Sequence, residues 1–150
     1  MREKGKEVEG PPTPQIPQIV KSLAIAIEKG LKIPLVSNTS SYDSLSVLKL
    51  LEGIVDIYML DTRYSDDKIA LKYSNALKYF EIMKSAIKKM QRQVGDLVLN
   101  ENGVAVRGLI VRHLVLPNNL AGSEKIFDFL AKEISKNVFL NIMDQYTPHY

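Results

Sequence analysis

Apolar residues along the chain follow two alternating patterns, one typical of amphipathic helices and the other of short buried strands. The stretch 15–29 carries isoleucine, valine and leucine at helical spacing and stops at Gly30. Continuous apolar runs such as 33–36 and 55–60 lie between stretches of this kind and are typical of buried strands. In chain order the pattern predicts helix 15–29, strand 33–37, helix 44–51, strand 55–60, helices 66–72 and 75–93, a hairpin of strands 97–99 and 104–106, strand 109–116, helix 123–134 and strand 138–143.

Strands separated by helices predict an α/β fold, in which a parallel sheet is connected by crossover helices. A closed (β/α) barrel takes about 250 residues, whereas this chain has 150. The sequence therefore predicts either a small open α/β sheet or part of a barrel. Residues 1–14 are polar and rich in proline, which predicts a flexible lead or loop, and 15–150 are expected to form a single α/β domain.

Composition excludes several kinds of chemistry. The chain has no cysteine, so it forms no disulfide and cannot by itself hold a thiolate-bound zinc ion or an iron–sulfur cluster. The net charge is only +3, and the densest basic patch has the spacing of a solvated helix face, so no nucleic-acid partner is expected. No apolar stretch is long enough to span a bilayer, and no signal peptide is evident, so we expect a cytoplasmic location and no membrane partner.

Four polar clusters follow the predicted strands, and in a parallel sheet such positions share one rim. They are 38–40, 61–63, 117–119 and 144–146. Polar residues at these places also cap helices and build loops, so a shared ligand site and ordinary loop chemistry remain alternatives. No G-x-S-x-G, G-x-G-x-x-G or P-loop motif is present.

Arg112 and His113 interrupt a strand that is otherwise apolar. Neighbouring side chains in a strand point to opposite faces, so one of the two must point into the interior, where an unpaired charge is costly. Two interpretations follow. Arg112 forms a buried pair with Asp61 or Asp56, or it lines a ligand cavity and contacts a cofactor.

Seven short segments form an ordered set of motifs along the chain: PTPQIP at 12–17, NTSSYDS at 38–44, VDIYMLD at 55–61, KYSNA at 72–76, RQVGD at 92–96, VRHLVLP at 111–117 and NIMDQYTP at 141–148. Together they resemble radical S-adenosylmethionine proteins similar to pyruvate formate-lyase activating enzyme. The likeness runs in order from about residue 10 to the end of the chain.

The resemblance implies the C-terminal part of a partial (β/α) TIM-like barrel. It places Asn38 and Thr39 beside bound S-adenosylmethionine and a monovalent cation, and it makes Met59 and Asp61 partners of that cation. Arg63 stands where relatives often have lysine near the cofactor carboxylate. The cysteine loop that holds the [4Fe–4S] cluster in this family has no counterpart here, because the chain has no cysteine.

The resemblance therefore implies a fragment of an activase-like radical S-adenosylmethionine protein that is not catalytic alone. Two alternatives remain open. One is a non-catalytic binding or scaffold module, and the other is a subunit completed by a separate cluster-bearing polypeptide. The partner expected is this N-terminal cluster-bearing half or a second copy of the chain, since strand 33–37 would offer an exposed sheet edge.

Overall fold

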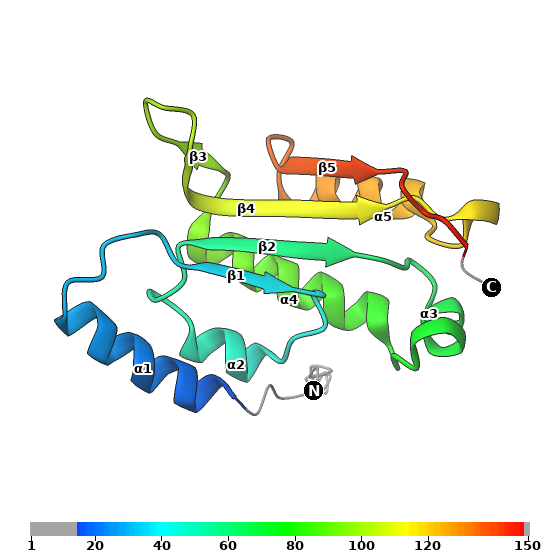
Figure 1. Cartoon of the computed structure of the whole chain (residues 1–150). Coiled ribbons are helices and arrows are strands. Elements are labelled where there is room, and N and C mark those ends of the chain that lie inside the picture. Colours follow the sequence, from blue (N-terminus) through cyan, green and yellow to red (C-terminus); the bar gives the residue numbers. More distant parts are fainter. Residues whose placement is uncertain (1–14, 149–150) are drawn as a thin grey trace, which may run out of the picture.

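The computed structural model describes residues 15–148 (Figure 1), so the predicted flexible lead 1–14 lies outside the described residues. Its elements are the following: α1 Ile16–Glu28, β1 Val36–Thr39, α2 Leu45–Leu50, β2 Ile57–Thr62, α3 Asp67–Ser74, α4 Tyr79–Val94, β3 Val98–Leu99, β4 Ala105–Leu114, a 3-10 turn Pro117–Asn119, α5 Ser123–Phe129, a π-helical turn Leu130–Ile134 and β5 Phe139–Met143. None of the helices in this part of the chain is long and apolar enough to cross a membrane.

The sheet has β1, β2, β4 and β5 side by side and parallel, with β3 antiparallel to the beginning of β4. Helices separate the successive parallel strands, so the prediction of an α/β fold with a parallel sheet is confirmed. β1 lies at one edge of the sheet and β5 is paired only with β4. All four parallel strands therefore direct their carboxyl ends to the same rim (Figure 1).

Local sequence signals explain where the helices begin. The Ser44 side chain accepts a hydrogen bond from Val47 N at the start of α2, and Asp66 accepts from Lys68 N and Ile69 N at the start of α3. The helix predicted over 75–93 begins only at Tyr79, because Asn75 and Lys78 both adopt positive φ and interrupt the chain between α3 and α4. The helix predicted over 123–134 is α-helical only to Phe129 and widens into the π-helical turn.

Three strands differ clearly from their predicted bounds. β2 spans Ile57–Thr62 rather than 55–60, a shift of two residues. β1 begins at Val36, two residues after Pro34, and the peptide N–H of Leu35 binds the Asp56 carboxylate at 2.8 Å instead of a strand. The predicted hairpin strand 104–106 and strand 109–116 are one continuous strand, β4. Gly108 joins them with φ +120°, and β4 changes there from pairing with β3 to pairing with β2.

One face of the sheet carries the core. In Figure 1, α4 and α5 lie behind the sheet, and α1 and α2 lie below its β1 edge. On this face the fully buried hydrophobic side chains of the sheet are Tyr58, Leu60, Leu109 and Val111. They pack in one core with Met83, Ile87 and Met90 from the inner side of α4.

The opposite face, which we call the open face, is less well covered. Its side chains alternate with those of the core along β2, β4 and β5. Met59, Ile110 and Leu114 there are only partly buried, and Phe139 is half exposed. Within the same surface lie Asp61 and Arg112, so the open face combines apolar area with charge.

Candidate functional site

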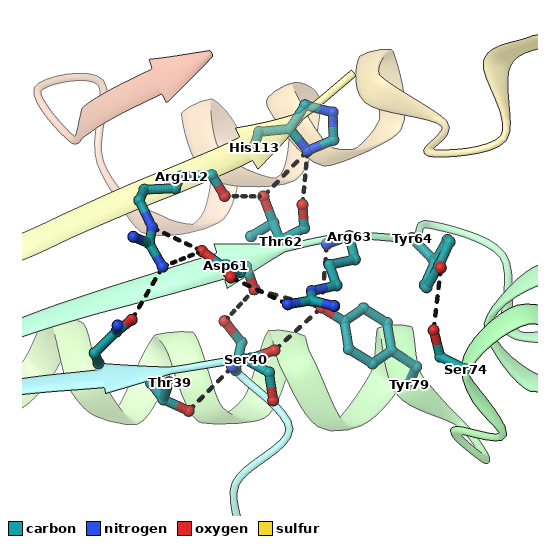
Figure 2. Close-up of polar contacts among 12 residues, drawn as sticks. Thr39, Ser40, Asp61, Thr62, Arg63, Tyr64, Ser74, Tyr79, Arg112 and His113 are labelled. Atoms are coloured by element: carbon teal, nitrogen blue, oxygen red, sulfur yellow. Dashed lines mark hydrogen bonds and ion pairs between the residues drawn. The ribbon is translucent and has the colours of Figure 1, made fainter. Parts of the chain in front are cut away.

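The rim of the open face brings together residues from three neighbouring strands. Sheet register sets Asn38 opposite Met59 and Asp61 opposite Arg112. Figure 2 shows Asp61 at the centre, with Arg112 reaching it from β4 and Arg63 from the segment after β2. Asn38, Asp61 and Arg63 thus lie at one rim, as their positions at the ends of parallel strands predict.

Two guanidinium groups hold the Asp61 carboxylate. Arg112 Nε donates to Asp61 Oδ1 at 2.7 Å, and Arg63 Nη2 donates to Asp61 Oδ2 at 3.3 Å. Arg112 Nη2 also donates to Asn38 Oδ1 at 3.0 Å. The pair of Arg112 with Asp61 that the sequence allowed is thus present, whereas the alternative partner Asp56 accepts from Leu35 N.

The charge balance of this cluster favours anions. Two arginines face one carboxylate, which leaves one positive charge at the rim. Arg63 is about half exposed and Arg112 about a quarter exposed, so both present donors to an incoming ligand. Guanidinium groups bind carboxylates and phosphates through paired hydrogen bonds, which makes such an oxyanion the natural ligand group here.

The same geometry does not fit the monovalent cation that the resemblance implies. Both oxygens of Asp61 and Oδ1 of Asn38 already accept from guanidinium groups. A further cation about 4 Å from a fixed positive charge is repelled by about 4 kcal/mol at an effective dielectric constant of about 20. No group of three or more His, Cys, Asp or Glu side chains within residues 15–148 is placed to hold a metal ion.

The end of β1 is fixed by a short network of hydroxyl and carboxyl groups. The Thr39 hydroxyl donates to Asp43 and accepts from Ser41 N at 3.2 Å. Burial raises the pKa of the Asp43 carboxyl, and the Thr39 hydrogen bond opposes that rise. Ser41 is fully buried with φ +63°, and its hydroxyl donates to Asp61 O at 2.7 Å. A left-handed serine held in this way marks a loop whose position is set by its surroundings.

Tyr79 of α4 connects these strand ends, whereas the sequence predicts it only as part of the helix 75–93. Its hydroxyl accepts from Arg63 N at 3.1 Å and donates to Ser40 O at 3.2 Å, with Asp61 O at 3.4 Å (Figure 2). The Tyr79 ring is 3% exposed and stacks on Tyr42 at a centroid distance of 5.8 Å. Burial raises the pKa of the Tyr79 hydroxyl, which therefore stays protonated as a donor.

His113 points away from the open face and is fully buried. Its Nδ1 lies 2.8 Å from Thr62 O, an acceptor only, so Nδ1 carries the proton and donates. Nε2 then accepts from the Ser123 hydroxyl at 2.8 Å. Burial lowers the pKa of His113, and the neutral ring has both nitrogens satisfied. We assign His113 to the structure of the core.

A cavity of about 300 Å³ opens at the rim beside Arg63. Its lining combines the charged side chains of Asp61 and Arg63 with apolar and aromatic residues that include Met143 and Tyr146. Of the predicted rim clusters, 61–63 and 144–146 thus contribute to this cavity. The cluster 38–40 lines a neighbouring cavity of about 460 Å³ between α1, β1 and α2, and 117–119 forms the 3-10 turn.

Comparison with known proteins gives one informative likeness. An uncharacterized protein of Methanocaldococcus jannaschii is 35% identical to this chain over 144 residues, which cover 95% of the chain. The match occupies only 37% of that protein. The chain resembles part of a longer protein. No family model and no solved structure matches the chain.

Proposed function

We propose that this chain forms the S-adenosylmethionine-binding part of a radical S-adenosylmethionine protein, with the fold of a partial (β/α) barrel. The observation that carries the proposal is the cationic rim at the carboxyl ends of parallel strands, beside a cavity of about 300 Å³. A cavity of this size accepts a small molecule. The residues of the rim are also those for which the sequence resembles that family.

The cavity offers a charged group for the amino-acid part of S-adenosylmethionine and apolar side chains for its ring system. Arg63 is placed to receive a carboxylate, which the amino-acid end of S-adenosylmethionine carries. The apolar lining with Tyr146 and Met143 suits a flat ring system at the other end of the molecule. Arg112 and Asn38 extend the polar side of the site across the open face.

The iron–sulfur cluster does not fit this chain. Cysteine thiolates hold such clusters, and the sequence contains none. Cluster chemistry must therefore come from another polypeptide or segment, and the open face of the sheet is where a complementary half of the barrel would pack. The part of the Methanocaldococcus relative that lies outside the match, 63% of its length by subtracting 37% from the whole, is the first partner to test.

Binding of S-adenosylmethionine tests the proposal directly. We expect titration of the isotope-labelled chain to shift the backbone amide signals of 38–40, 61–63 and 112–114 in NMR spectra. Arg63→Met should weaken binding by about tenfold or more, since a hydrogen bond to a charged group contributes about 1.5–3 kcal/mol. Lys132→Met is the matched control, because Lys132 is exposed and pairs with Asp128 on the surface of the helical segment.

Two results would contradict the proposal. One is the absence of any ligand-dependent shift at the rim at millimolar S-adenosylmethionine. The other is equal weakening by Arg63→Met and Lys132→Met, which would show that only overall charge matters.

The alternative is a binding or scaffold module that is never completed by a cluster-bearing half. The absence of cysteine is the observation that favours it. Co-expression with the unmatched part of the Methanocaldococcus relative distinguishes a barrel completed by a second half from a module that functions without one. Co-purification with stoichiometric iron and sulfide supports the completed barrel, whereas failure to associate supports the module.

A further inference from the structure

The oxygens that the resemblance assigns to a monovalent cation are already in contact with a cation that belongs to the chain. The Arg112 guanidinium donates to Asp61 Oδ1 at 2.7 Å and to Asn38 Oδ1 at 3.0 Å. These acceptors come from β2 and β1, so one side chain of β4 bridges three neighbouring strands. We infer that Arg112 takes the place of a bound monovalent cation, so that this rim receives an anionic ligand without K⁺ or Na⁺.

Electrostatics makes the guanidinium and a bound metal ion mutually exclusive. Asp61 is the acidic member of the cluster, and Arg63 engages its second oxygen at 3.3 Å. Both oxygens of the Asp61 carboxylate already accept hydrogen bonds from arginines, so none is left for an ion beside Arg112. Such an ion would also add to the net positive charge of the cluster. Because the guanidinium is covalently attached to β4, the built-in cation does not dissociate.

Arg112 also retains donors for a ligand. A guanidinium carries five N–H groups, and those on Nε and Nη2 account for the contacts with Asp61 and Asn38. The side chain is 26% exposed, and it lies on the open face near Asp61. A ligand carboxylate therefore meets a covalently fixed charge rather than an exchangeable ion, and its affinity does not depend on which cation the buffer contains.

Removing the guanidinium should convert the rim into a cation site. In Arg112→Ala the oxygens of Asp61 and Asn38 lose their shared donor and become ligands for K⁺. Arg107→Ala is the control, since Arg107 lies on the same strand, is exposed and binds Gln93 O at 2.7 Å, away from the rim. Both variants lose one positive charge, so general effects of charge and salt are matched.

Thermal unfolding in KCl, with choline chloride added to keep ionic strength constant, measures the increase in Tm that K⁺ binding produces. We expect no K⁺-specific change in Tm for the wild type or Arg107→Ala. Arg112→Ala should show a rise in Tm that grows with the logarithm of the K⁺ concentration and reaches about 3–6 °C at ten times the dissociation constant. Arg112→Lys should behave as the wild type, because an ammonium keeps the charge in place.

Thallium-205 NMR measures the cation directly, with Tl⁺ as the probe for K⁺. K⁺-displaceable Tl⁺ binding by Arg112→Ala, absent from the wild type, supports the inference. K⁺-displaceable binding by the wild type that disappears in Asp61→Asn would overturn it. So would a folded Arg112→Ala that binds no Tl⁺ and gains no K⁺-dependent stability.

The inference rests on the proposed function only for the identity of the ligand. Titration with S-adenosylmethionine should give the same affinity in KCl and choline chloride for the wild type, but a K⁺-dependent affinity for Arg112→Ala. If S-adenosylmethionine binds neither protein, the proposed function fails, while the Tl⁺ and Tm measurements still decide whether Arg112 replaces a cation.

Discussion

The hydroxyl of Tyr79 is a single atom on which the geometry of the rim depends. It satisfies Arg63 N and Ser40 O, two backbone groups from different strand ends. Tyr79→Phe keeps the ring but leaves these groups without their partner, so we expect a loss of about 1–3 kcal/mol in the free energy of unfolding. Urea denaturation measures it. Tyr73→Phe, at a ring 53% exposed on α3, should change stability by no more than about 0.5 kcal/mol.

His113 makes stability depend on pH. Burial lowers the pKa of His113 in the folded protein, so the folded state resists protonation while the unfolded state binds a proton below about pH 6.5. The contribution of His113 is complete above that pH and decreases as pH falls toward the folded-state pKa. Unfolding free energies at pH 7.5 and 5.5 should differ in this direction. His113→Gln should be less stable at pH 7.5 and should lose most of the difference; an unchanged slope would show that other groups titrate.

At the scale of single residues, the sequence identified the charged side chains that pair at the rim, but not the tyrosine hydroxyl that holds the strand ends in position. Arg112 stood out because a charge inside an apolar strand requires a partner, and Asp61 was one of two carboxylates named for it. Tyr79 gave no such signal, since its partners are backbone atoms 16 and 39 residues away in sequence. Contacts of this kind depend on how α4 packs across the strand ends, which periodicity does not specify.

At the scale of elements, Gly108 lies where β4 passes from pairing with β3 to pairing with β2 and β5. Its φ is +120°, and a Cβ there would lie 2.4 Å from Asp96 O. Gly108→Ala should therefore lower the free energy of unfolding by about 3 kcal/mol or more. Gly103→Ala is the control: Gly103 also has positive φ, at +74°, but nothing lies within 4 Å of the added carbon. That variant should lose only about 1–2 kcal/mol. Equal losses would show that backbone strain alone, and not the clash, explains Gly108.

The order of elements followed from hydrophobic periodicity, because most apolar runs and helical stretches bury side chains against α4 or the sheet. Two elements are exceptions: α1 buries Ile16 but leaves Ile19 and Ile27 about half exposed, and both residues of β3 are exposed. Strand ends were less predictable. Pro34 lies in an apolar run, but the strand begins only at Val36. The fusion of the predicted hairpin with the following strand depends on Gly108, whose conformation is set by Asp96 and Asp56 from elsewhere in the chain.

At the scale of the whole molecule, the open face should drive association. Apolar surface buried there contributes about 25 cal/mol per Å² before entropic costs. Without a cluster-bearing partner we expect a homodimer that dissociates at micromolar concentrations. Light scattering over a dilution series measures it. Phe139→Glu, on the open face, should shift the equilibrium to monomer, whereas Leu71→Glu on α3 should not. A 16.9 kDa particle at every concentration would contradict the prediction.

The polar row on the open face also governs which surfaces can pack there. Asn38, Asp61, Arg112 and Asn141 cross the four parallel strands, with Asp61, Arg112 and Asn141 in direct register. A wholly apolar surface laid over this row would bury guanidinium donors without acceptors, at a cost of several kcal/mol. Only a complement that supplies matching oxygens recovers that cost. The polar row therefore disfavours nonspecific association of the open face. A partner that binds there must match the row in its hydrogen-bonding groups as well as in its shape.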